Sequence, residues 1–135
     1  MFVGFDPKQQ AKHEQYLIDR WGEGMKQDIA ESKRKIKNWT KADWERSTVA
    51  FAEICRDLVA AMKRERPTDS PEVQLIIRRH YEWLKQFWTP KRKSYVGHSQ
   101  MIVDSPLRQA YEAQHPQLPE FLALAIRVFA EQELA

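Results

Sequence analysis

The clearest pattern of apolar and polar positions runs from Ser70 to Trp88. Ser70 and Pro71 are typical of a helix start, because serine caps free backbone N–H groups and proline has no N–H to leave unpaired. On a helix, eight side chains share one broad face: Val73, Ile76, Ile77, His80, Trp83, Leu84, Phe87 and Trp88. The pattern predicts a helix that buries this face. The imidazole of His80 near its middle indicates either a hydrogen-bonded core histidine or the polar group of a ligand pocket.

A second long helix is predicted just before the first, from Thr40 to about Arg66. Thr40 and Asp43 have the spacing of a capping box, and Pro67 ends the pattern. Its apolar stripe contains Trp44, Phe51, Ile54, Cys55, Leu58 and Met62. Because the loop between the two helices is short, we expect an antiparallel hairpin whose apolar faces meet.

Further helices are predicted on both sides of this hairpin. They cover Pro7–Trp21, Met25–Trp39, residues 91–103, Leu107–Ala113 and Pro119 to about Leu134. The last of these is apolar over more than half its girth, so we expect it to be central; its apolar positions are Phe121, Leu124, Ala125, Val128 and Phe129. No stretch alternates as a half-buried strand would. The sequence therefore predicts one all-α domain, residues 1–135, of about six or seven helices.

Composition excludes several classes of protein. With 42% hydrophobic and 30% charged residues, the chain is globular rather than disordered. No apolar run approaches the roughly 18 residues of a membrane span, and the N-terminus has no signal-peptide pattern, so we expect a cytoplasmic protein without membrane contact. The net charge of +3 is mild. We interpret the basic segments at 33–35, 63–64 and 91–93 as solvated helix faces and loops rather than a nucleic-acid footprint.

Catalytic and metal-binding motifs are absent from the sequence. There is no HExxH, CxxC, Walker or GxGxxG pattern, the histidines have no ligand spacing, and a single cysteine cannot build a thiolate metal site. A nucleophilic pair of Cys55 and His80 is one alternative, but nothing in the sequence indicates an oxyanion hole. We therefore predict a protein that is not an enzyme and has no metal or cofactor, and keep as an alternative a small helical enzyme that uses His80 or His98.

Aromatic side chains are more numerous than one small core needs. The chain has five tryptophans, six phenylalanines and four tyrosines. Some of these rings would line a cavity for a large, partly aromatic ligand, where stacking and shape provide most of the recognition. An aromatic-rich core without a cavity is the alternative.

A series of short motifs, taken in order along the whole chain, resembles the TipAS antibiotic-recognition domain. The motifs are FxGFDP (Phe2–Pro7), RWG (Arg20–Gly22), a serine before a basic run (Ser32), WTKADW (Trp39–Trp44), PTDSPEV (Pro67–Val73), RHYEWL (Arg79–Leu84), an aromatic-Thr-Pro step (Phe87–Pro90) and P-x-L-x-x-F…AI…FA (Pro116–Ala130). The TipAS domain forms the C-terminal, effector-sensing half of certain MerR-type transcription regulators in bacteria. It also occurs as a free-standing product that sequesters the drug.

The resemblance implies an all-α, globin-like fold with a deep central cleft for large hydrophobic or heterocyclic molecules, notably thiopeptide antibiotics. It also implies that the N-terminal part of the domain is mobile and orders around the ligand, so we expect residues 1–25 to be mobile without one. The sequence pattern agrees, because the helix Pro7–Trp21 is polar in its first half and has little with which to pack.

Two features of the chain depart from the family. The MerR helix-turn-helix and its coiled-coil linker are missing, so we expect a stand-alone domain, an internal-start product or an excised segment. Such a chain would make no direct DNA contact and would be a monomer alone, but a dimer within a full-length regulator. The thiopeptide-binding prototype also carries a cysteine just before its Ser/Thr-Pro step, where this chain has Trp88. We therefore predict non-covalent binding, of a thiopeptide or of another bulky ligand.

The residues and the resemblance together predict a sensing domain for antibiotics or other bulky hydrophobic molecules. The predicted wall residues are Trp44, Phe51, His80, Trp83, Phe87, Trp88, Tyr111 and Phe129. His80 would orient the ligand as a hydrogen-bond donor or acceptor. Simple packing is the alternative for each aromatic ring, and we expect roughly half of the set to be core. A drug-sequestering resistance protein with the same pocket is the alternative function.

Overall fold

The computed structural model describes residues 25–134, which form six helices and no strand. The helices are α2 (Met25–Ile36), α3 (Lys41–Lys63), α4 (Pro71–Leu84), α5 (Arg92–Asp104), α6 (Arg108–Glu112) and α7 (Leu118–Glu133). The predicted all-α class is confirmed over this range. The predicted helix Pro7–Trp21 and the expected mobility of residues 1–25 concern a segment outside the described part of the chain, apart from Met25.

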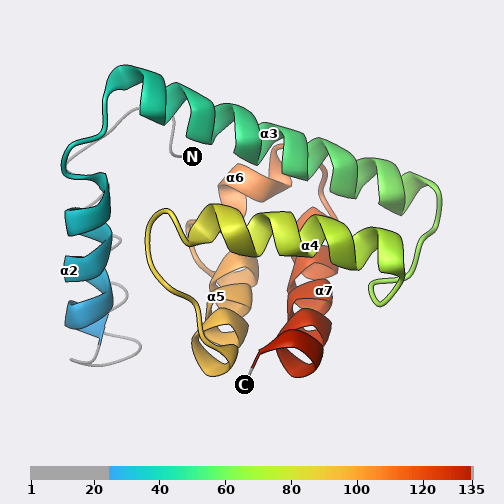
Figure 1. Cartoon of the computed structure of the whole chain (residues 1–135). Helices are drawn as coiled ribbons and strands as arrows, with labels where there is room; N and C mark the ends of the chain where they lie inside the picture. The colour runs from blue at the N-terminus through green and yellow to red at the C-terminus, as the bar shows by residue number, and fades with distance from the viewer. Residues whose placement is uncertain (1–24, 135) are drawn as a thin grey trace.

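The helices α3 and α4 form an antiparallel hairpin that lies across α5 and α7 (Figure 1). The short helix α6 joins α5 to α7 under α3, and α2 stands at one side, near the start of α3. The apolar faces of α3 and α4 meet in the core, as predicted from the short loop between them. None of the described helices is both long enough and apolar enough to cross a membrane.

Both helices of the hairpin begin where the sequence predicts. The backbone N–H of Asp43 donates to Thr40 Oγ1 at 3.2 Å, and the backbone N–H of Thr40 donates to Asp43 Oδ2 at 2.8 Å, which completes the capping box. At the start of α4, Ser70 Oγ accepts from the backbone N–H of Val73 at 3.3 Å. Pro71 occupies the first turn, where its missing N–H leaves no bond unmade.

Three helices end earlier than predicted, and one of them is α3, which stops at Lys63 rather than at about Arg66. The helix α4 stops at Leu84 rather than at Trp88, and residues 85–87 form a turn instead of a further helical turn. In that turn the backbone N–H groups of Phe87 and Trp88 both donate to the carbonyl of Leu84, at 2.8 and 3.0 Å. The helix α2 stops at Ile36 rather than at Trp39, since the extended backbone of the following N-cap requires the chain to leave the helix first.

The helix α7 is central, as predicted, because it contacts α3, α4, α5 and α6. Its buried face carries Leu122, Ile126 and Phe129. One predicted apolar position, Leu124, instead points to solvent with 52% of its surface exposed. At 100° per residue, Leu124 lies about 140° from Phe129 around the helix axis, too far to share the buried face.

Candidate ligand-binding groove

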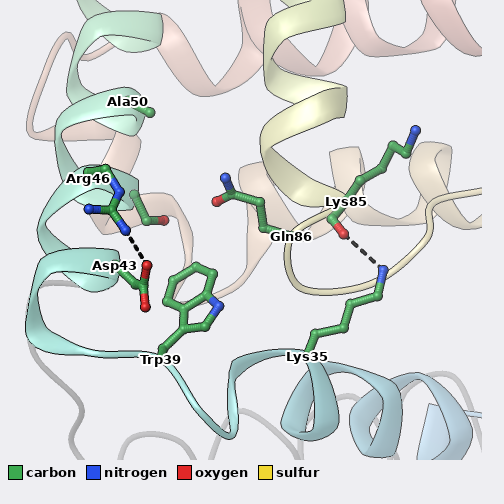
Figure 2. A pocket seen from close by; sticks show the side chains of 8 residues that line it. Lys35, Trp39, Asp43, Arg46, Ala50, Lys85 and Gln86 are labelled. Atoms are coloured by element: carbon green, nitrogen blue, oxygen red, sulfur yellow. Dashed lines mark hydrogen bonds and ion pairs between the residues drawn. The ribbon is translucent and has the colours of Figure 1, made fainter.

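An open groove of about 620 Å³ lies where the end of α2, the start of α3 and the end of α4 meet (Figure 2). It is lined by Lys35, Trp39, Asp43, Arg46, Ser47, Ala50, Lys85 and Gln86. One large aromatic surface, the indole of Trp39, therefore faces several charged and polar side chains. We call this site the α2 groove.

A continuous series of aromatic rings leads from the α2 groove into the core. Trp39 packs edge-on against Trp44, with ring centroids 4.8 Å apart, and lies 5.4 Å from Phe87. Phe87 is 5.2 Å from Trp83, which is in turn 5.2 Å from Phe51. Pairs at these separations favour tilted and edge-to-face arrangements, which hold each ring in a defined orientation. The core behind Trp39 thus fixes the aromatic surface that the groove presents.

Four residues hold α2 against the end of α4, and we call them the α2 latch: Glu31, Lys35, Lys85 and Thr89. The backbone N–H and the hydroxyl of Thr89 donate to Glu31 Oε1 at 2.9 and 3.0 Å. Lys35 Nζ donates to the carbonyl of Lys85 at 2.9 Å (Figure 2). It also lies 3.4 Å from Thr89 Oγ1 and 3.3 Å from Glu31 Oε1. The hydroxyl of Thr89, followed by Lys35, lowers the pKa of Glu31. The latch therefore depends on an ionised Glu31.

The groove's other wall carries an ion pair at the start of α3, between Arg46 and Asp43 (Figure 2). Hydrogen bonds from Thr40 lower the pKa of Asp43, with Arg46 contributing less, so the carboxylate stays charged at neutral pH. The amide of Gln86 stands at the end of α4. The α2 groove thus offers donors and acceptors of both charges around one stacking surface, an arrangement suited to orienting a large heterocycle.

His80 lies in the core, away from the α2 groove. Its Nδ1 is 2.7 Å from the hydroxyl oxygen of Tyr95 and its Nε2 is 3.1 Å from that of Tyr111, and none of its surface is exposed. Burial, with the nearby ring of His98, lowers the pKa of His80 to about 3. A neutral imidazole has one N–H and one free nitrogen, so one tyrosine donates to His80 and the other accepts from it. This network ties α4 to α5 and α6.

The predicted wall residues occupy three different places. Trp44 and Phe87 form the layer directly behind Trp39. In the core, each at most 4% exposed, lie Phe51, His80, Trp83, Tyr111 and Phe129. Trp88 is half-buried, with its ring 5.8 Å from that of His98. Although none of the eight lines the α2 groove itself, the indole N–H of Trp83 donates to the groove residue Ser47, to its carbonyl at 3.0 Å and its hydroxyl at 3.1 Å. Their contact with a ligand stays a prediction.

The chemistry of the described residues offers little for catalysis. Burial raises the pKa of the Cys55 thiol to about 12, so Cys55 carries no thiolate with which to attack a substrate. His80 is engaged by two tyrosines rather than by Cys55. No group of three or more metal-binding side chains gathers within residues 25–134.

Sequence reasoning missed the polar lining of the α2 groove. The sequence pattern placed Trp39 only at the end of the predicted helix Met25–Trp39 and in the WTKADW motif, although its position next to the capping box, five residues before Trp44, was a signal that the two indoles meet. Lys35 and Lys85 had no such signal. These two residues are 50 positions apart in the chain, and local sequence patterns carry no information about a contact over that separation.

Comparisons with known proteins agree on one family. The family model for the TipAS antibiotic-recognition domain matches residues 13–129. The HTH-type transcriptional regulator SkgA from Caulobacter vibrioides is 35% identical over 133 residues, which cover 96% of this chain and 52% of that protein. The HTH-type transcriptional activator TipA from Streptomyces coelicolor is 29% identical over 134 residues, covering 93% of this chain and 49% of that protein. The chain therefore spans about half the length of these curated relatives.

A solved structure extends the agreement to the fold. TipAS from Streptomyces lividans, in complex with nosiheptide and described within a thiopeptide antibiotic multidrug resistance system, matches with a TM-score of 0.80 and 26% identity. The match covers 97% of this chain and 90% of that one. The TipAS domain is a non-catalytic recognition domain. The resemblance inferred from the motifs is thus confirmed, and this chain belongs to the TipAS antibiotic-recognition domain family.

Proposed function

We propose that this domain is the effector-sensing part of a MerR-type transcription regulator and that it binds a bulky hydrophobic molecule non-covalently. Family membership supports recognition of an antibiotic-type ligand, and the TipAS structure with nosiheptide supports a thiopeptide as the first candidate. The names of SkgA and TipA support a regulator context in the cytoplasm. In this proposal the fold is globin-like, and the α2 groove is the described part of its ligand cleft.

One observation carries the proposal: the aromatic face of Trp39 lines a groove and is fixed from behind by Trp44 and Phe87. A planar heterocycle stacked on this indole would bury apolar surface against a ring that is already held in place. Binding would therefore cost the Trp39 side chain little conformational entropy. The groove volume of about 620 Å³ falls within the range typical of ligand pockets, about 300–1,000 Å³.

The remaining wall residues enter the proposal in two layers. Trp44 and Phe87 would support Trp39 and contact the parts of a ligand that reach past it. The other predicted residues would reach the same ligand only if the hairpin of α3 and α4 opened. They are the buried residues Phe51, His80, Trp83, Tyr111 and Phe129, and Trp88, whose ring packs near that of His98. We therefore propose Trp44 and Phe87 ahead of the deeper residues as ligand contacts.

Non-covalent binding follows from the state of the single cysteine. Cys55 is fully buried and its raised pKa keeps the thiol protonated. Because a thiolate is the nucleophile in covalent capture, Cys55 cannot take that role in this fold. Trp88, at the position that matches the family's cysteine, has no nucleophilic group.

The first experiment is a titration of intrinsic tryptophan fluorescence with thiopeptides, other bulky antibiotics and aromatic cationic drugs. We expect a saturable change at about one ligand per chain, and Trp39→Leu to weaken binding about tenfold or more, because losing a stacked indole removes about 1–3 kcal/mol. Phe121→Leu on α7 is the matched control, since Phe121 is a half-buried aromatic residue that does not line the groove. Trp39→Phe should restore much of the affinity.

Two results would contradict this proposal. The first is the absence of any saturable response from a protein that unfolds cooperatively. The second is an equal loss of affinity in Trp39→Leu and Phe121→Leu, which would mean that the change reports general stability rather than a contact in the groove.

One specific observation supports the alternative function, a resistance protein that sequesters the drug. The TipAS chain that binds nosiheptide is matched over 90% of its length, so a domain of about this size binds the drug in that structure without the rest of a regulator. Protection of a sensitive bacterium in proportion to the amount of this domain, with no change in transcription, would favour sequestration over sensing.

A further inference from the structure

Two basic segments that are far apart in the sequence lie beside each other at the α2 side of the molecule. One is the last turn of α2 and the residues after it, and the other is the loop end and first turn of α5. The α2 latch joins them, because Glu31 binds Thr89 and Lys35 binds the carbonyl of Lys85. Thr89 lies only two residues before Lys91, so the second segment begins within about 7 Å of the latch.

This arrangement produces one region with many cations. We call it the basic surface, and its members are Lys33, Arg34, Lys35, Lys37, Lys85, Lys91, Arg92 and Lys93. All eight residues are exposed. Two carboxylates in the described part of the chain offset some of this charge, because Glu31 pairs with Lys35 and Glu82 pairs with Lys85.

Five of these eight cations have no ion-pair partner among the described residues. Within residues 25–134, no ion pair involves Arg34, Lys37, Lys91, Arg92 or Lys93. The third basic segment of the chain differs, because Arg64 and Arg66 both pair with Glu72 at the far end of the hairpin. Although the net charge of the chain is only +3, the positive charge without an ion-pair partner among residues 25–134 is therefore concentrated beside α2 and the start of α5.

We propose that the basic surface contacts the phosphate backbone of duplex DNA without reading its sequence. Exposed lysines and arginines spread over two elements can each neutralise a phosphate, and the release of counterions drives such binding. This departs from the expectation of no direct DNA contact, which rested on the missing helix-turn-helix and on separate, solvated basic segments.

Two observations favour DNA over other anionic partners. A basic surface that binds membranes usually inserts apolar side chains beside its charges. Among the residues whose exposure the structure describes, the exposed large apolar side chains are Val49, Leu75 and Leu124, which lie on α3, α4 and α7, outside the basic surface. The curated relatives are HTH-type regulators about twice as long as this chain, so a domain of this kind would work close to DNA. The second argument rests on the regulator context proposed above, but the contact itself requires no ligand.

The test is fluorescence anisotropy of a short labelled duplex of arbitrary sequence with the full chain and no antibiotic. We expect binding at about 50 mM salt that weakens about 10²–10³-fold by 200 mM, as for about five phosphate contacts. Arg92→Gln/Lys93→Gln should weaken binding and reduce the salt slope by about 2, close to one unit per lost phosphate contact. Lys63→Gln/Arg127→Gln, which removes the same charge from exposed positions on α3 and α7, is the control and should change the slope much less.

Several outcomes would overturn the inference. These are no binding at low salt, equal effects of the two double variants, or tighter binding to anionic phospholipid vesicles with the same dependence on Arg92 and Lys93, which would make this a membrane-binding surface. Failure here would leave the proposed ligand binding untouched, because the fluorescence titration contains no DNA. Failure of that titration would equally leave the anisotropy result standing.

Discussion

The two sides of this molecule are held together by different kinds of interaction. On the side of α5 and α7, fully buried rings surround the network of His80, Tyr95 and Tyr111. On the side of α2, exposed charged groups of the latch make the contacts, and Trp39 supplies most of the aromatic packing. Burial of apolar surface stabilises far more than exposed ion pairs do. We therefore expect a ligand to enter on the α2 side, where it would disturb the core least.

The largest expected effect comes from removing the centre of the core network. His80→Ala should lower the free energy of unfolding by about 3–5 kcal/mol, since it leaves a cavity and two buried tyrosine hydroxyls without their partner. Urea denaturation measures this loss, and His115→Ala, in a half-buried turn, is the control. If His80→Ala instead weakened ligand binding and left stability intact, His80 would be the orienting group of a pocket. The assignment of His80 to the core, apart from the ligand-binding side, would then be wrong.

The burial of His80 also predicts that the stability of the folded protein depends on pH. The pKa of His80 is about 3 in the folded protein, against an ordinary value of 6.5, so below pH 6.5 the unfolded chain takes up a proton that the folded chain does not. Stability should therefore fall as the pH drops from 6.5 towards 3, by at most about 1.4 kcal/mol per unit. Denaturation at several pH values between these limits measures the slope. His80→Gln should flatten this slope, and equal slopes in the variant and the unaltered protein would contradict the assignment.

A smaller and local effect is expected on the α2 side. Thr89→Val removes the hydroxyl that donates to Glu31 and accepts from Lys35 while keeping the side-chain shape. We expect hydrogen exchange in α2 to become about fivefold faster, corresponding to about 1 kcal/mol or less for an exposed bond, with α7 unchanged. Thr48→Val, whose hydroxyl bonds only within α3, is the control.

The latch should also respond to acid. The pKa of Glu31 is lowered in the fold, so its contribution is present above the ordinary value of 4.5 and is lost as the pH falls through the folded pKa. Exchange in α2 should accelerate in that range before the core unfolds. Simultaneous opening of α2 and α7 would show that the two sides are one cooperative unit.

The smallest expected effect is a gain in stability at the end of the hairpin. Glu65 has φ of 57°, a left-handed conformation that costs a residue with a Cβ more than glycine. Glu65→Gly should raise the free energy of unfolding by about 0.5–1 kcal/mol, after the greater freedom of glycine in the unfolded chain is subtracted. Arg64→Gly, at a neighbouring position with φ of −86°, should instead destabilise in the same denaturation assay. Neither change should alter exchange in α2.

The candidate site was only partly within reach of sequence reasoning. The aromatic excess pointed to Trp44 and Phe87, which lie behind Trp39, and equally to rings that are deep in the core, because a helical face does not reveal its depth. The polar lining was missed for a related reason. Lys35 and Lys85 look like any solvated lysines until the latch places α2 beside the end of α4.

By itself, the sequence determined what depends on neighbours along the chain. The all-α class, the capping box at Thr40, the start of α4 and the central α7 follow from periodicity and from short-range hydrogen bonds, and the order of motifs identified the family. Only the tertiary structure decided which aromatic rings are core, where the groove opens and which basic segments meet. These features depend on contacts between residues tens of positions apart, and their energies are set by burial and by the polar partners that folding brings together.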